Sequence, residues 1–351
     1  MGALILACAL AAILGFATHR ASVCTVRAIA EVISSRTGHM LASIGKSAMW
    51  VIVVTSPVIL LMPSAGTSLT GWPLSGSAVL GGFIFGIGAA INGGCAFSTM
   101  ARLVDGEGGM LVAIIALAFG ILCFATLVDW QWLERPLPTP ALASSLGAWA
   151  LVMALALALW SVFEAVRLWR ARSAGTGFRD LVLAPQYRLS SAAMLIGLAS
   201  AAIFLIQGSA SYTVTLQQLI EGLDSTRGFP ATERWALLLA LMAGMFLSTV
   251  QRGSFRMDWR PRRIWLRNLF GGLLMGLGVA LTPGGNDALV LYGIPSLSPH
   301  ALPAFLTMTL GIALGLWVMR ACFGIEMRVA CRNDLYILDS QPQTATSLHS
   351  R

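Results

Sequence analysis

Charge is scarce in this sequence, and that scarcity excludes a soluble protein. Charged residues make up 11% of the 351 residues and hydrophobic residues 57%, whereas about a quarter of the residues in a soluble domain are charged. Apolar runs of helical length recur along almost the whole chain. The sequence therefore predicts an all-α polytopic membrane protein without a soluble domain. It should have about nine transmembrane helices, near residues 3–18, 42–62, 77–98, 110–128, 141–163, 190–208, 234–251, 268–287 and 301–320.

The sequence also lacks the patterns that mark most enzymes and cofactor proteins. It has no nucleotide-binding loop, no Ser-His-Asp set and no metal-ligand cluster. Its four histidines are scattered, at His19, His39, His300 and His349. We therefore expect no catalytic residues, no metal and no cofactor, in a protein that is not an enzyme.

Lysine is almost absent, because Lys46 is the only one among 23 basic residues. The arginines stand at span ends and in loops, so the net charge of +8 reports membrane topology and not nucleic-acid binding. The loops 63–76, 129–140 and 209–233 hold few of them, whereas the alternate loops around 167–188 and 252–267 are rich in arginine. The positive-inside rule predicts a bacterial inner-membrane protein with a periplasmic N-terminus and a cytoplasmic C-terminus.

Six cysteines are present, but no CxxC pair or zinc spacing, which argues against a disulfide framework. Cys8, Cys123 and Cys322 lie in apolar runs, where a thiol packs as a small hydrophobic group. Cys331 belongs to the predicted tail. Cys24 and Cys95 differ, because each stands in a polar or glycine-rich break close to an arginine.

An internal repeat becomes visible when the chain is shifted by about 190 residues. Residues 81–94 then fall on 271–284 with six identities in 14 positions, and the first four spans fall on the last four. One extra span separates the halves, so the second copy would enter the membrane from the opposite side. The predicted division is a first inverted repeat at 1–128, a connecting span with an Arg-rich linker at 129–189, a second inverted repeat at 190–320 and a cytoplasmic tail at 321–351. Two unrelated helices packed through small residues would also give such a match.

Matching breaks interrupt the apolar runs at membrane depth. Irregular backbone is tolerated there only where it is buried in protein or lines a wet cavity. A helix that restarts after such a break presents free N–H groups and its positive dipole end, which suit an anion. The first-half breaks contribute the candidate substrate-binding residues Arg20, Cys24, Gly93, Gly94, Cys95 and Ser98, and the second-half break contributes Gly284, Gly285 and Asn286.

Some of these residues have simpler explanations. Arg20 could attract an anion or merely enforce topology. Asn286 could be a helix cap. Arg102, close to Asp105 and Glu107, is expected to form a structural ion pair. The thiols of Cys24 and Cys95 could serve as weak donors along a path, or as nucleophilic or redox groups activated by arginine and helix N-termini.

Three motifs carry a resemblance to a known family: Arg20-Ala21-Ser22-Val23-Cys24-Thr25, the run from Gly81 to its Gly-Gly-Cys ending at Cys95, and residues 269–278. In these the chain resembles the YeeE/YedE family of bacterial sulfur-transport membrane proteins, whose members take up thiosulfate. The resemblance implies an hourglass of nine spanning helices plus short re-entrant helices, in which three cysteines hand thiosulfate along.

Two of the three family cysteines correspond to Cys24 and Cys95, but the third does not. The second-half Gly-Gly-Cys is Gly284-Gly285-Asn286 here, followed by Asp287. An amide can donate to an anion oxygen but cannot replace thiol chemistry, and an unpaired carboxylate beside it would repel a dianion.

The sequence thus predicts a permease for thiosulfate or a related small sulfur anion, which passes Cys24, Cys95 and Asn286 without covalent change. The alternative is a membrane sulfur-relay or sulfur-sensing protein. In that case Cys95 would carry a persulfide or report substrate to a cytoplasmic sulfur carrier or regulator docked on the 252–267 loop. A purely structural membrane subunit comes third.

Overall fold

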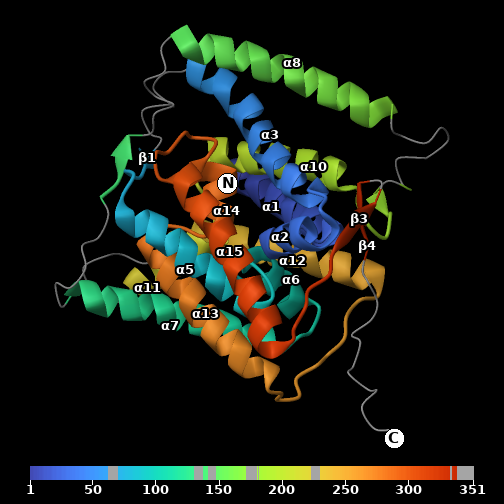
Figure 1. Cartoon of the computed structure of the whole chain (residues 1–351). Helices are drawn as coiled ribbons and strands as arrows, with labels where there is room; N and C mark the ends of the chain where they lie inside the picture. The colour runs from blue at the N-terminus through green and yellow to red at the C-terminus, as the bar shows by residue number, and fades with distance from the viewer. Residues whose placement is uncertain are drawn as a thin grey trace, which may run out of the picture.

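The fold is described by a computed structural model that covers residues 1–61, 70–129, 137–140, 148–170, 180, 182–222, 230–332 and 334–337. Its helices are α1 (Gly2–Ala21), α2 (Thr25–Ser35), α3 (His39–Leu61), α5 (Gly76–Asn92), α6 (Ala96–Val104), α7 (Gly109–Asp129), α8 (Ala148–Arg170), α10 (Leu189–Gln207), α11 (Tyr212–Gly222), α12 (Thr232–Arg252), α13 (Ile264–Leu281), α14 (Asn286–Ala288) with the π-helical turn η2 (Leu289–Gly293), and α15 (Ala301–Phe323). Two small antiparallel pairs complete it, β1 (Thr70–Gly71) with β2 (Thr139–Pro140) and β3 (Ala330–Arg332) with β4 (Leu335–Ile337) (Figure 1).

The chain is an all-α multi-pass membrane protein, as the apolar runs predicted. Eight helical segments of the described residues are long and apolar enough to cross a membrane, at 2–35, 39–58, 76–104, 109–128, 189–222, 232–252, 264–281 and 301–323. The predicted fifth span, 141–163, corresponds to α8, which starts at Ala148 and is not among these eight. Most of the predicted loop 129–140 and the tail beyond residue 337 lie outside the described residues.

Two predicted spans contain the breaks that the sequence predicted within them. The run 77–98 is α5 followed by the start of α6, and the run 268–287 is α13 followed by α14. Hydropathy alone reads each run as continuous, whereas the paired glycines Gly93-Gly94 and Gly284-Gly285 mark where the first helix of each run ends.

The same order of elements occurs twice along the chain. In each half, two long helices enclose a short one, and this triplet is followed by a second triplet of the same kind. The first half has α1, α2 and α3, then α5, α6 and α7; the second half has α10, α11 and α12, then α13, α14 with η2, and α15. Their packing pairs match as well, since α1 packs on α12 as α10 packs on α3, and α5 packs on α15 as α13 packs on α7. Helices α5 and α13, which occupy matching positions, pack on each other.

Glycines allow α5 and α13 to approach closely. A Cβ atom built on Gly88 would stand 2.7 Å from the Gly271 carbonyl oxygen, and one on Gly278 would stand 2.7 Å from that of Gly81. The two helices are therefore antiparallel and meet backbone to backbone, which is how membrane helices associate without a hydrophobic driving force. Gly81 and Gly271 are the residues that the 190-residue shift superposes, and so are Gly88 and Gly278.

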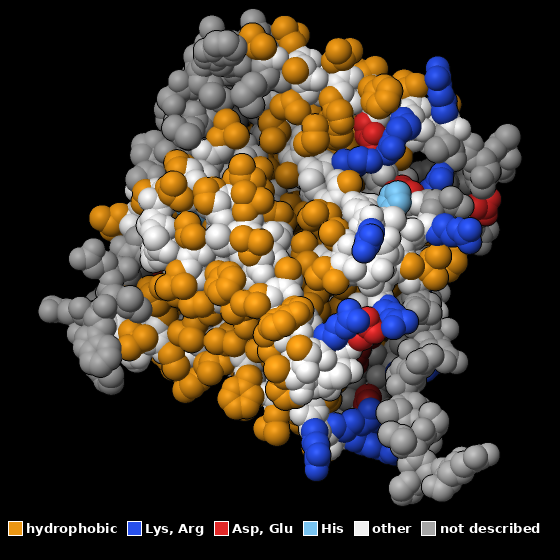
Figure 2. Space-filling view, viewed as in Figure 1, with side chains coloured by type: hydrophobic (Ala, Val, Ile, Leu, Met, Phe, Trp, Pro, Cys, Tyr) orange, Lys and Arg blue, Asp and Glu red, His pale blue; other side chains and the backbone are white. Residues whose placement is uncertain are grey.

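The outer surface divides into an apolar belt and a basic rim. Figure 2 shows hydrophobic side chains over most of the described face, with Lys and Arg gathered along the edge where Figure 1 places β3 and β4. Large apolar side chains such as those of Leu159 and Phe163 on α8 are 74% and 66% exposed, as lipid-facing positions should be. The exposed arginines of the chain include Arg36, Arg256, Arg260, Arg262, Arg263 and Arg328.

The predicted tail begins as structured chain. Helix α15 continues to Phe323, and the β3–β4 hairpin then packs on α2 and on the start of α10. Ser34 Oγ donates to the Val329 carbonyl at 3.0 Å, and the Asp334 carbonyl accepts from Leu189 N–H at 2.8 Å. Burial and the nearby Glu31 carboxylate raise the pKa of Cys331 in this hairpin to about 12, so its thiol stays neutral and unreactive.

Candidate functional site

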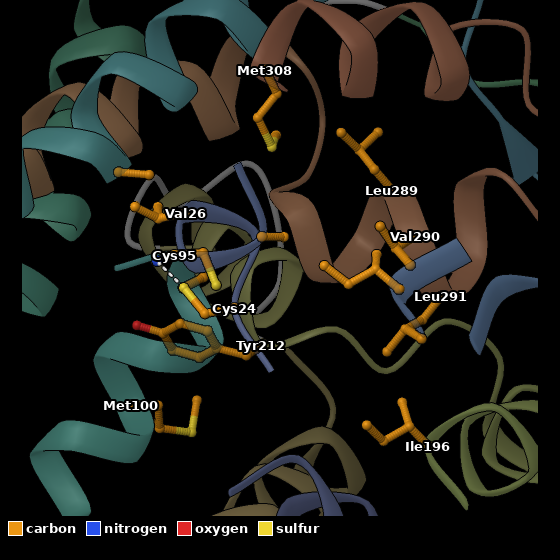
Figure 3. Close-up of a cluster of buried hydrophobic side chains, with 14 of the residues drawn as sticks. Cys24, Val26, Cys95, Met100, Ile196, Tyr212, Leu289, Val290, Leu291 and Met308 are labelled. Carbon is orange, nitrogen blue, oxygen red and sulfur yellow. Dashed lines mark hydrogen bonds between the residues drawn. The ribbon is translucent and has the colours of Figure 1, made fainter. Parts of the chain in front are cut away.

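The starts of the short helices meet inside the molecule. Backbone N–H of Cys95, before α6, donates to Cys24 Sγ, before α2, at 3.5 Å. Asn286 at the start of α14 donates through Nδ2 to Thr25 Oγ1 of α2 at 3.4 Å. Thr213 at the start of α11 donates to Asp287 of α14. All four breaks of the two halves thus converge, as Figure 3 shows for Cys24, Cys95 and Tyr212.

The first-half break owes its shape to glycine. Gly93 ends α5 with φ of +77°, a left-handed conformation that glycine adopts without strain. The N–H groups of Gly93 and Gly94 return to the carbonyls of Ala90 and Ala89 at 3.1 and 3.0 Å. Asn92 Nδ2 donates to Gly94 O at 3.1 Å and to Thr99 Oγ1 at 2.8 Å. This fixed turn delivers Cys95 to the N-cap position of α6.

Cys24 and Cys95 form a buried thiol pair. Each occupies the N-cap position of its helix, each is 1% exposed, and both are free thiols. The N–H groups of Thr25 and Ser98 face the Cys95 sulfur. Both sulfurs therefore lie at the positive ends of two helices, where unpaired N–H groups favour an electron-rich ligand.

The second-half break repeats this contact with different chemistry. Gly284 turns at φ of +137°, and Gly285 N–H donates to Thr213 Oγ1 at 2.9 Å. This bond corresponds to that from Cys95 N–H to Cys24 Sγ, so Thr213 matches Cys24 and Gly285 matches Cys95. Asn286 lies one residue further on. Gly285 holds the N-cap position of α14, so the alternative in which Asn286 is a helix cap is wrong.

Two pockets lie against the meeting point. The first, here called the thiol pocket, is lined by Thr18, Val23, Cys24, Thr25, Ile44, Ser47, Cys95, Phe97, Ile196, Asn286, Asp287, Val290 and Leu291. Cys24, Cys95 and Asn286 thus share one cavity. Asn286 Oδ1 is buried without a hydrogen-bond partner, so it has an acceptor free for a ligand or water.

The second pocket, here called the tyrosine pocket, is lined by Ala11, Leu14, Phe97, Ile203, Ala210, Ser211, Tyr212, Thr215, Arg234, Leu237, Leu238, Leu241, Asp287, Leu291 and Tyr292. Tyr212 Oη and Arg234 Nη1 are buried without partners. A buried phenol and guanidinium with free donors suit an oxyanion. Phe97, Asp287 and Leu291 belong to both pockets and form the wall between them.

The remaining predicted residues do not line either pocket. Gly93 and Gly94 shape the turn, and Ser98 is buried one turn into α6. Arg20 is 1% exposed and donates to the Ala184 carbonyl at 2.6 Å and to Gln251 Oε1 at 2.8 Å.

The expected ion pair of Arg102 is present, with Glu107 at 2.6 Å. Asp105 turns away from it and accepts from His19, Thr249 and Ser254. Burial alone would raise the pKa of Asp105, but these hydrogen bonds and the His19 ring hold it below its ordinary value.

Sequence reasoning missed part of the site. Ser211, Arg234 and Tyr292 were not among its candidates, and Asp287 was noted only as a neighbour of Asn286. Arg234 carried one usable signal, since it is a basic residue at the end of a loop that the positive-inside rule leaves poor in arginine. Tyr292 carried none, because its run reads as ordinary apolar helix.

An all-helical membrane protein whose interrupted helices bring their N-termini together around buried pockets has the construction of a transport protein. The chain belongs to the sulphur transport family, whose model matches residues 20–314, in agreement with the resemblance drawn from its motifs. It is 25% identical over 276 residues to the thiosulfate transporter TsuA of Spirochaeta thermophila, covering 69% of this chain and 77% of that protein. It is 23% identical over 268 residues to the thiosulfate transporter TsuA of Escherichia coli K12, covering 69% of this chain and 74% of that protein.

Proposed function

We propose that this protein is an inner-membrane transporter that carries thiosulfate or a related small sulfur anion without changing it covalently. The observation that carries the proposal is the Cys24–Cys95 thiol pair, which lines a buried pocket at two helix N-termini. Membership of the sulphur transport family and the names of the two relatives support the same substrate class.

The two ends of thiosulfate would find different partners in the thiol pocket. Helix N–H groups and the Asn286 amide can donate to the oxyanion end. The thiols can meet the terminal sulfur as weak, polarisable donors. Weak contacts suit passage, because a carrier must release what it binds.

The tyrosine pocket would hold the anion before the thiol pocket does. It lies beside Arg234 at the start of α12, which follows the loop predicted to face the periplasm. An anion would pass from the donors of Arg234 and Tyr212, across the wall of Phe97, Asp287 and Leu291, to the thiol pair.

The repeated order of elements supports the division into inverted repeats at 1–128 and 190–320. In that arrangement the substrate site lies where the two halves meet, and access alternates as one half moves against the other. The basic rim in Figure 2 then faces the cytoplasm. A cytoplasmic sulfur carrier or regulator could dock there, on the exposed arginines of the 252–267 loop.

The test is uptake of radiolabelled thiosulfate by vesicles that contain the purified protein. We expect uptake above that of empty vesicles, which unlabelled thiosulfate inhibits more strongly than unlabelled sulfate. Uptake by the protein-containing vesicles that is no greater than uptake by empty vesicles would contradict the proposal. A mass increase of one sulfur atom on Cys95 without uptake would instead support the sulfur-relay alternative.

A further inference from the structure

We propose that Asp287 takes up a proton when the anion crosses from the tyrosine pocket to the thiol pocket, so that transport is coupled to proton movement. The inference rests on the proposed function and adds the ion that drives it. A buried ionisable residue within a membrane span is costly and usually has a functional role.

Asp287 is one of the described residues that line both pockets and form the wall between them. Its side chain is 1% exposed, and only Phe97 and Leu291 also line both cavities. Since the other two are hydrophobic, Asp287 is the one polar group that an anion meets on both sides of this wall.

In its ionised form, the Asp287 carboxylate would accept three hydrogen bonds. Gly285 N–H donates to Thr213 Oγ1 at 2.9 Å, and the Thr213 hydroxyl donates to Asp287 Oδ1 at 2.6 Å. Val214 N–H donates to Ser211 Oγ, which gives its proton to Asp287 Oδ2 at 2.6 Å. Thr213 N–H is a third donor, at 3.2 Å. The Ser211 and Thr213 hydroxyls also lie 3.0 Å from each other, so the protons of both are used within this network.

The charge of this carboxylate has no cationic partner. None of the ion pairs in the described part of the chain includes Asp287. The titratable or charged groups that face it are Tyr212, Tyr292, Arg234, Cys24 and Cys95. Only Arg234 is a cation, and it lines the tyrosine pocket alone. An anion that leaves Arg234 for the thiol pocket therefore meets an uncompensated negative charge.

Protonation of Asp287 removes that obstacle. A proton from water on the outer side forms an O–H bond at Oδ1 or Oδ2, and the hydroxyl that pointed at this oxygen is released. Thr213 or Ser211 can then donate to the passing anion, and so can the new Asp287 O–H. The proton leaves to water on the cytoplasmic side after the anion, and the ionised carboxylate with its three donors is restored.

The structural alternative is that Asp287 only anchors α14 to the start of α11. The two roles differ in what Asp287→Asn should do. The amide keeps the shape, and its oxygen can accept from one of the two hydroxyls while its nitrogen donates to the other, so an anchor would survive while proton coupling would be lost.

The experiment uses vesicles with the membrane potential clamped by potassium and valinomycin, and a trapped pH dye. In wild-type vesicles, external thiosulfate should acidify the lumen. A pH gradient of one unit, acid outside, should raise accumulation by up to about tenfold for each proton coupled. In Asp287→Asn, any exchange of labelled for unlabelled thiosulfate that remains should not respond to the gradient. Glu233→Gln, which removes an exposed carboxylate next to Arg234 in the sequence, is the matched control and should keep the response.

Each outcome separates the two proposals. Exchange without lumen acidification in wild type, or a full gradient response in Asp287→Asn, would overturn the inference while the proposed function stands. Absence of exchange in wild type would overturn the proposed function itself. If Asp287→Asn is misfolded or inert, the pH dependence of uptake by Ser211→Ala tests the inference instead. Loss of one donor to the ionised carboxylate should move the pH profile of uptake to higher pH, and an unchanged profile would overturn the inference.

Discussion

The thiol pocket depends on small side chains that begin helices. Cys24 and Cys95 occupy N-cap positions where serine or aspartate would give a stronger cap. A thiol stabilises the start of the helix less than serine or aspartate would, but it leaves the N–H groups of the helix available to a ligand. Asn286 faces the same cavity, with its Nδ2 on Thr25 and its Oδ1 free.

Asn286 offers a test at this scale. Asn286→Cys should keep or improve thiosulfate uptake, because a thiol is a softer contact at a position that needs only a weak donor. Asn286→Asp should abolish uptake, since a carboxylate repels an anion at ~4 Å by about 4 kcal/mol per pair of unit charges at an effective dielectric of about 20. The measurement is initial uptake rate at matched protein levels. Wild-type uptake by the Asp variant would remove Asn286 from the substrate contacts.

The sequence identified the thiol pair but not the groups facing it. Cys24 and Cys95 stood out because their breaks mix glycine, polar residues and arginine in apolar surroundings. Ser211 and Thr213 were not among its candidates. Both donate to Asp287, more than 70 residues away along the chain, and no local pattern predicts such a pairing.

At the scale of elements, helix positions follow from apolar runs, and their packing follows from glycine. Gly276 of α13 lies on α7, where a Cβ would stand 2.0 Å from the Leu117 carbonyl oxygen. Gly86 of α5 meets the Met308 carbonyl of α15 in the same way, at 2.1 Å. Backbone atoms of two helices cannot retreat from such a contact as a flexible side chain would.

Gly276→Ala should therefore lower thermal stability in detergent, by about 1–3 kcal/mol in the free energy of unfolding, the usual cost of overpacking. The matched control is Gly45→Ala in α3, where a Cβ meets no atom within 4 Å. That change should leave stability unchanged or raise it by up to about 1 kcal/mol, because alanine favours helix. Equal melting temperatures for the two variants would show that α7 and α13 do not pack so closely.

At the scale of the whole molecule, the orientation of the two halves depends on α8. Its 23 residues span about 34 Å at 1.5 Å per residue, enough for a bilayer core of about 30 Å. Its later end is fixed near the start of α10, because Glu164 pairs with Lys46 at 2.9 Å and Arg167 donates to Ser190 at 3.1 Å. With α8 the chain crosses nine times and its ends lie on opposite sides. Without it, eight crossings place them on the same side.

Reporter fusions distinguish these topologies. We expect an alkaline phosphatase fused between residues 72 and 75 to be active, and one fused to the C-terminus to be silent, because the basic rim should face the cytoplasm. A fluorescent protein at the C-terminus, which should be bright, is the complementary control. An active C-terminal phosphatase would contradict nine crossings and with them the inverted arrangement of the halves.

The central claim is that a sulfur anion passes the thiol pair of Cys24 and Cys95. Its most direct test is uptake of radiolabelled thiosulfate by vesicles that contain single Cys→Ala variants, with folding checked by size-exclusion chromatography. Cys24→Ala and Cys95→Ala should abolish uptake, because each removes a sulfur from the pocket. Cys8→Ala, Cys123→Ala and Cys322→Ala, outside both pockets, should transport as wild type does. Equal uptake by all five variants would contradict the claim.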